Sequence, residues 1–171
     1  MPVATRRLAL VAALASVLVM VGPFPAPWGL VVVNAVLVAL AAADALLSPR
    51  PDRVAVERDA PAIVALDGRA DIVWRVSNPT GRRLRVSVAD QLAPSLRAGL
   101  RRFSVEVPPL GRKTVTTGIN PSRRGRFTPT EMDVRVVGPL GLAGRQARRA
   151  VPGIVRVYPP FRSRREAELR I

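Results

Sequence analysis

Two apolar stretches open the chain, and a short proline-rich turn separates them. Leu8–Gly22 carries no charged residue, and Gly29–Leu47 is slightly longer. A helix needs about 20 predominantly apolar residues to cross a bilayer. The second stretch has that length, whereas the first reaches it only if the turn dips into the membrane interface. The pattern therefore predicts a transmembrane hairpin of two helices over residues 1–49, with spans at about 8–24 and 28–47.

Charges around the hairpin predict its orientation. Arg6 and Arg7 precede the first span, and Arg50 and Arg53 follow the second. Because arginine and lysine are enriched on the cytoplasmic side of membrane spans, both ends of the hairpin and the following domain are expected in the cytoplasm, at the cell (inner) membrane. The competing interpretation is a secretory signal peptide over residues 1–27, which is disfavoured because a second span follows directly and no Ala-x-Ala site precedes the prolines.

Two polar residues interrupt the second apolar stretch. Asn34 is expected to hydrogen-bond across the hairpin, and Asp44 lies within a turn of the cytoplasmic end, where it is expected to reach water. The spans hold no relay of ionisable groups, which argues against a transport role.

From residue 51 onward the apolar period changes to two, which predicts strands with one buried face. Seven short sets alternate in this way, with proline and glycine turns between them. Seven strands at this spacing predict an all-β domain, an immunoglobulin-like sandwich, over residues 50–160. Asp90–Gly99 is expected to hold a helical turn at most, and residues 161–171 are a charged tail or truncated linker. The alternating positions are Val54 and Val56; Ile72, Trp74 and Val76; Leu84, Val86 and Val88; Phe103, Val105 and Val107; Val115, Thr117 and Ile119; Val134 and Val136; and Val155 and Val157.

The composition gives the chain a strong net positive charge. Lysine and arginine total 27 against 12 acidic residues, a formal net charge of +15, and the arginines occur in clusters. A field of this size attracts anionic surfaces, and a domain tethered beside an anionic leaflet would meet lipid headgroups first. Nucleic acid is disfavoured as a partner, because aromatic residues make up only 4% of the chain and do not alternate with the arginines.

The side chains that carry most catalytic and metal chemistry are missing. The chain has no cysteine and no histidine, which excludes disulfides, Cys/His metal sites and Cys–His or Ser–His pairs. Glu131 and Asp133 share one face of a predicted strand, and a solvated face accounts for them better than an acid–base pair does. The sequence therefore predicts no catalytic residue, no cofactor, no metal site and a protein that is not an enzyme.

Three short motifs, taken in order, resemble one known family. Pro121–Phe127 is similar to the Arg-Gly-aromatic segment of the bacterial domain of unknown function 58 family, Gly138–Leu142 to its Asp-Pro-Phe-Gly-Leu motif, and Val155–Pro159 to its Val-Tyr-Pro motif. Gly138 and Leu140 stand where that family usually has Asp and Phe. The motif residues, which we interpret as structural, are Arg123, Arg124, Gly125, Phe127, Gly138, Pro139, Gly141, Leu142, Val157, Tyr158 and Pro159.

The motif residues are expected to act through the backbone or through packing. Gly125 and Gly141 suit turns with unusual backbone angles. Pro139 and Pro159 would rigidify loops, and Tyr158 is expected to pack against the domain.

The resemblance implies a continuation into a von Willebrand factor A-like domain, before which this chain stops at Ile171. It also implies a MoxR-type AAA+ ATPase as assembly partner. We therefore expect a membrane-anchored scaffold or interaction protein without catalysis. Two alternatives stay open: an anionic-lipid-binding peripheral module that acts through its arginine clusters, and a fragment of a larger protein with no independent activity.

Overall fold

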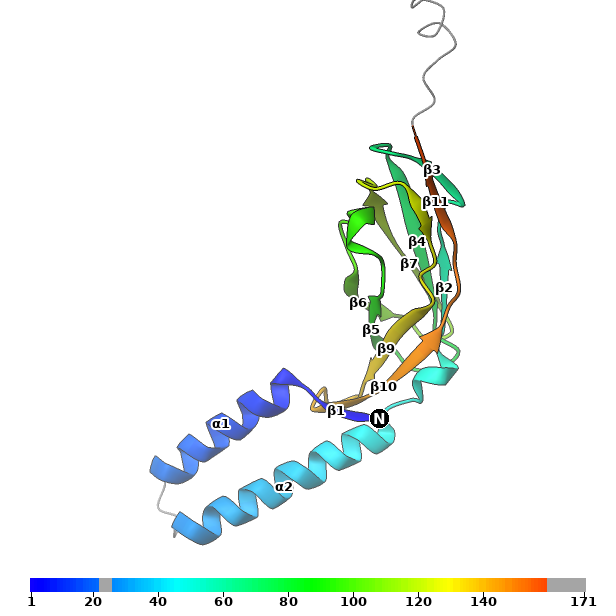
Figure 1. Ribbon diagram of the computed structural model, residues 1–171. Helices are drawn as coiled ribbons and strands as arrows, with labels where there is room; N and C mark the ends of the chain where they lie inside the picture. The colour runs from blue at the N-terminus through cyan, green and yellow to red at the C-terminus, as the bar shows by residue number, and fades with distance from the viewer. Residues whose placement is uncertain (22–25, 160–171) are drawn as a thin grey trace, which may run out of the picture.

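The computed structural model describes residues 1–21 and 26–159. The predictions for the proline-rich turn and for the tail at 161–171 lie outside these residues. Two helices, α1 (Arg6–Val21) and α2 (Ala26–Leu47), lie side by side and extend from one end of an elongated β-domain (Figure 1).

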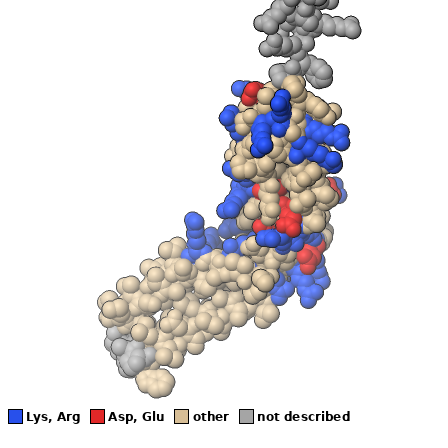
Figure 2. Space-filling model, in the orientation of Figure 1, with Lys and Arg blue, Asp and Glu red and all other residues tan. Residues whose placement is uncertain are grey.

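The helices present apolar side chains outward. Leu14, Leu18 and Val38 are all largely exposed, and the visible face of both helices carries no charged side chain until the junction with the β-domain (Figure 2). Within the described residues, one helical stretch, Trp28–Arg53, is long and apolar enough to cross a membrane by length and composition. Because α1 has only 16 residues, the structure contains one helix of spanning length and a shorter apolar helix beside it.

The larger sheet of the β-domain has five strands in the order β1-β10-β9-β5-β6, and all neighbours are antiparallel. The first strand comes from the extreme N-terminus, before the helices, so the β-domain is not confined to residues 50–160 as predicted. The strands are β1 (Pro2–Ala4), β5 (Leu84–Asp90), β6 (Arg102–Val107), β9 (Glu131–Val137) and β10 (Ala143–Ala150).

Two smaller sheets complete the domain. An antiparallel sheet has the order β2-β4-β7, and a short sheet has the order β3-β11-β8, in which β11 pairs parallel with β3 and antiparallel with β8. Two 3₁₀ turns are present: η1 (Pro51–Arg53) lies between α2 and β2, and η2 (Pro94–Leu96) lies between β5 and β6, where the sequence allowed a helical turn. The strands are β2 (Ala55–Asp59), β3 (Ile63–Ala65), β4 (Ala70–Ser77), β7 (Arg112–Ile119), β8 (Gly125–Phe127) and β11 (Val155–Tyr158).

A single apolar core lies between the sheets and makes the domain a β-sandwich. Ile72 and Trp74 of β4 face Val86 of β5 and Val134 of β9, and all four are fully buried. Burying a side chain of this size contributes about 1.5–3 kcal/mol relative to leaving it in water. Trp74 also packs on Phe103, with ring centroids 5.1 Å apart. The inward positions are those that the period-two pattern selected.

All seven predicted strands are present, as β2, β4, β5, β6, β7, β9 and β11, but four others were missed. Three of the four have only three residues each, too few for a period to be visible. The fourth, β10, reads Ala-Gly-Arg-Gln-Ala-Arg-Arg-Ala. It lacks large apolar residues; β1 pairs along one of its edges within the same sheet, and α2 contacts it.

Candidate functional site

The last turns of α2 carry a carboxylate that is completely buried. Asp44 has 0% of its surface exposed. Its Oδ1 accepts a hydrogen bond from the backbone N–H of Leu140 at 2.7 Å, and its Oδ2 accepts from Leu142 at 2.7 Å and Ala143 at 2.8 Å. Both oxygens are thus hydrogen-bonded, which offsets the cost of burying a charge. The prediction that Asp44 reaches water was wrong, because the loop over residues 138–143 folds against it.

Two glycines let this loop approach the helices. A Cβ atom at Gly138 would overlap the Asp44 carboxylate, so no larger residue fits there. Gly141 has a φ of +74°, which L residues rarely adopt, and a Cβ on it would lie 3.1 Å from Nη1 of Arg7. The expectation of unusual backbone angles is confirmed for Gly141, and for Gly125 with a φ of +142°.

The same loop is also held from the α1 side. Thr5 lies between β1 and α1, and its Oγ1 is 2.6 Å and 2.9 Å from the carbonyl oxygens of Gly141 and Leu142. Its backbone N–H donates to the Leu142 carbonyl at 3.0 Å. Oγ1 also accepts from the backbone N–H of Leu8 at 3.3 Å, which caps the start of α1. Both helices therefore attach to one loop.

Further bonds secure the end of α2. Ser48 is buried, and its Oγ donates to the Val136 carbonyl of β9 at 3.0 Å. Arg82 donates through Nη2 to the Leu47 carbonyl at 2.9 Å, which supplies a partner for one of the carbonyls left free at a helix C-terminus. We call Thr5, Asp44, Ser48 and the loop 138–143 the joint.

Asn34, the other polar residue of α2, plays no part in the joint. It is exposed, and its Nδ2 donates to the Leu30 carbonyl of its own helix at 2.9 Å. The expected hydrogen bond across the hairpin is therefore wrong. A single turn of the same helix satisfies the side chain instead.

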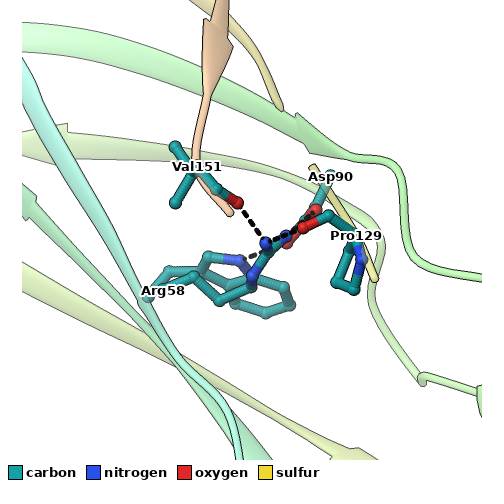
Figure 3. Close-up of polar contacts among 5 residues, drawn as sticks. Arg58, Asp90, Pro129 and Val151 are labelled. Atoms are coloured by element: carbon teal, nitrogen blue, oxygen red, sulfur yellow. Dashed lines mark hydrogen bonds and ion pairs between the residues drawn. The ribbon is translucent and has the colours of Figure 1, made fainter. Parts of the chain in front are cut away.

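A second buried charge network lies inside the sandwich (Figure 3). Arg58 of β2 and Asp90 of β5 form an ion pair of 2.6 Å with side chains 1% and 0% exposed. Arg58 also donates to the carbonyls of Pro129, at 2.6 Å, and Val151, while Trp74 donates through Nε1 to Asp90 at 2.8 Å. The network links β2 and β4 of the three-stranded sheet β2-β4-β7 to β5 of the five-stranded sheet, so its role is to hold the sandwich together. The alternating strand pattern alone did not predict it.

The remaining motif residues lie apart from the joint. Arg123 and Arg124 are exposed in the loop between β7 and β8, and Phe127 packs partly buried against the core. Val157 is buried in β11, whereas Tyr158 beside it is 44% exposed and so is only partly covered by the domain. The structure thus brings only the Gly138–Leu142 motif into the joint.

Pro139 is exposed within the joint loop, and Pro159 is exposed after β11. Their role in rigidifying loops stays a prediction.

Arginines gather beside the joint. A cavity of about 180 Å³ is lined by Arg7, Arg82, Arg83 and Arg85, by one carboxylate, Glu106, and by residues of the joint loop. Arg85 donates to Glu106 at 2.5 Å, and Arg83 is 3.9 Å from it. The hydrogen bond from Arg85, and then its charge, lower the pKa of Glu106 below its usual 4.5. Glu106 therefore stays ionised at neutral pH, and arginine predominates in the cavity.

The carboxylates weighed for acid–base chemistry are paired with arginine on a sheet surface. Glu131 and Asp133 lie on one face of β9, as predicted, and Arg148 of β10 is 3.7 Å and 3.4 Å from them. Ser122 donates to the Ser95 carbonyl instead. Within residues 1–21 and 26–159, no group of three or more acidic side chains is placed to hold a metal ion.

Fold and joint together define a β-sandwich domain fastened to two apolar helices. The sequence matches no family model and no curated protein. Solved structures with a similar fold include the CARDB domain of a Pyrococcus furiosus protein (18% identity, TM-score 0.44, 61% of this chain and 94% of that one), Salmonella alpha-2-macroglobulin (18%, 0.45, 63% and 7%) and a protein of unknown function from Porphyromonas gingivalis W83 (17%, 0.45, 64% and 49%). Likeness of this degree says nothing about activity or partners.

Proposed function

We propose that this chain is a membrane-anchored, non-catalytic scaffold or interaction protein. A transmembrane hairpin of α1 and α2 holds an immunoglobulin-like sandwich at the cytoplasmic face of the cell membrane. The joint is the observation that carries this proposal. A carboxylate buried with three backbone donors fixes the direction in which the helices leave the domain, and a fixed direction matters for a protein whose task is to hold a domain in place.

Exposed apolar surface on both helices supports membrane insertion. Large side chains point outward along α1 and α2, including Leu14, Leu18, Val31 and Val38. Soluble proteins rarely expose contiguous apolar patches of this kind. A bilayer provides the cover that the described residues do not, and the 22 residues of α2 match its thickness.

The N-terminal strand supports a retained anchor over a cleaved signal peptide. β1 adds the edge strand of the five-stranded sheet, and Thr5 binds the joint loop. Cleavage near residue 27 would remove both, and with them part of the folded domain. It would also leave the carbonyls of the joint loop without their Thr5 partner.

Topology can be tested directly because the chain has no native cysteine. Trp28→Cys places a single thiol at the outer end of α2, and Ser122→Cys places one in an exposed loop of the β-domain. In intact spheroplasts, a membrane-impermeant maleimide should label Trp28→Cys, whereas Ser122→Cys should react only after permeabilisation. The reverse pattern would overturn the cytoplasmic assignment. Extraction of the protein by alkaline carbonate would overturn membrane insertion itself.

We further propose membership of the domain of unknown function 58 family, with a MoxR-type AAA+ ATPase as assembly partner. The motifs Pro121–Phe127, Gly138–Leu142 and Val155–Pro159 support the family assignment. Glycine at position 138, where that family usually has Asp, fits this chain because a side chain there would overlap Asp44. Purification from native membranes in mild detergent, followed by mass spectrometry, should recover an AAA+ ATPase with the chain. Recovery of the chain alone would overturn this partner.

A further inference from the structure

The arginine-lined cavity beside the joint has properties that the scaffold role does not use. Four arginines and one carboxylate surround it, together with the backbone of the loop that binds Asp44. The joint itself needs only one of them, Arg82, which donates to the Leu47 carbonyl. The others bring positive charge to the cavity without contributing to the fastening of the helices.

The positive charges in this cavity are not balanced. Glu106 is the single lining carboxylate, and Arg85 and Arg83 already share it. Among the described residues, no carboxylate lies within 4.0 Å of the guanidinium groups of Arg7 or Arg82. Since like charges repel, four arginines gathered around one cavity favour the binding of an anion there.

The location of the arginine-lined cavity indicates which kind of anion could occupy it. The cavity is lined by Arg7 from the first turn of α1 and by Pro49, just beyond the end of α2. If the helices cross a bilayer, as proposed above, this level is the cytoplasmic headgroup layer, where anionic lipids concentrate. In Figure 2 the charged side chains likewise begin where the apolar helices meet the β-domain.

We propose that this cavity binds the phosphate of an anionic phospholipid headgroup. Guanidinium groups donate paired hydrogen bonds to phosphate oxygens, a geometry that favours arginine over lysine. The start of α1 adds the positive end of a helix dipole on the same side. A lipid held here would tie the membrane surface to the loop that fixes Asp44, so the bilayer would contribute to the same fastening. The inference rests on the proposed membrane anchoring.

The test uses the full chain reconstituted in nanodiscs of phosphatidylcholine with graded phosphatidylglycerol. Native mass spectrometry would measure how many phosphatidylglycerol molecules stay bound after release from the disc. Arg7→Gln combined with Arg83→Gln removes two cavity charges, whereas Arg123→Gln combined with Arg124→Gln removes two charges from the distant loop before β8. One arginine near an anionic surface contributes about a factor of five in affinity, so the cavity variant should bind phosphatidylglycerol about 25-fold more weakly.

The outcomes separate the cavity from the anchor. Weaker retention in the cavity variant, with the loop variant equal to wild type, supports the site. Equal retention in both variants overturns it while leaving membrane anchoring intact. Failure of the wild-type chain to enter nanodiscs overturns the proposed anchor and this site together. Added glycerol 3-phosphate distinguishes the sources: if it displaces the lipid at equal concentration, the site takes a soluble phosphate ester and the lipid assignment is wrong.

Discussion

Replacement of Asp44 by alanine would show whether the joint depends on its carboxylate. The substitution removes the acceptor of three backbone N–H groups, at 2.7, 2.7 and 2.8 Å. A buried donor left without a partner costs about 1–3 kcal/mol. Leu140 is exposed, so its N–H group can turn to water. We therefore take the lower end of this range for each N–H group, and the loss for the three groups together amounts to about 3 kcal/mol. At 1.4 kcal/mol per factor of ten, opening of the loop should become about 100-fold more favourable.

Hydrogen exchange reports this opening at the affected amides. The assay follows deuterium uptake by mass spectrometry in detergent micelles, in peptides covering residues 138–144 and residues 84–90 of β5. Asp44→Ala should speed exchange in the first peptide about 100-fold and leave the second unchanged, because local opening does not expose the core. Asp71→Ala is the matched control. Its carboxylate is exposed and makes no hydrogen bond or ion pair with the described residues.

Two results would refute this reasoning. If residues 138–144 exchange within threefold of the wild-type rate, the loop is held by its own backbone bonds, such as that from Gly141 to the Gly138 carbonyl at 3.1 Å. If residues 84–90 speed up equally, Asp44 supports the whole sandwich rather than the joint. Asp44→Asn should fall between wild type and Asp44→Ala, since its amide keeps one acceptor oxygen but turns an N–H group toward other N–H groups.

Three further predictions concern the buried ion pair, the glycine of the joint and an exposed ion pair. Asp90→Asn leaves the buried Arg58 guanidinium without its ion pair, so it should lower the free energy of unfolding by about 3 kcal/mol, measured in thermal melts followed by near-ultraviolet circular dichroism. Asp59→Asn breaks an exposed ion pair and should cost less than about 1 kcal/mol; equal costs for the two variants would contradict the burial of the Arg58–Asp90 pair. Gly138→Ala should raise exchange at the joint as Asp44→Ala does, whereas Gly81→Ala, with open space around it, should not; normal protection in Gly138→Ala would refute the steric argument. Arg85 lowers the pKa of Glu106 in the folded protein, so the stabilisation from this pair should be present above pH 4.5 and lost as the pH falls through the folded-state pKa. A carboxyl ¹³C titration of Glu106 with a midpoint at or above pH 4.5 would count against the pair.

The sandwich core could be predicted because alternation and burial coincide. Alternate residues are buried from Ile72 to Val76 in β4, from Leu84 to Val88 in β5 and from Met132 to Val136 in β9, and these residues are all large and apolar. The same alternation, taken together with the charged positions, could have predicted the buried ion pair of Arg58 and Asp90. Asp90 continues the inward series of β5 after Val88, and Arg58 continues that of β2 after Val56. Two opposite charges at inward positions indicate a buried ion pair. This signal is lost when acidic residues are considered without asking which face of the strand they lie on.

Asp44 could not be identified in the same way. It shares a helical stripe with Leu37 and Ser48, and all three are buried. The helix around them is apolar on every side, so the stripe does not stand out in the sequence. The partners of Asp44 are backbone N–H groups about a hundred residues away, and backbone groups leave no mark on composition or periodicity. The two glycines of the loop were visible as turn formers, but only the fold shows that Gly138 makes room for a carboxylate.

Both helices are attached to the β-domain through neighbouring parts of strand β10. β1, which leads into α1, pairs with β10 from Pro2 to Ala4, and Asp44 of α2 binds the loop that enters β10 at Ala143. β10 in turn pairs with β9 along seven residues. Both helices are therefore attached to the five-stranded sheet through β10 and the loop that leads into it. This arrangement explains how a strand without large apolar residues can hold its place, since its ladder partners on both edges and the helix ends fix it.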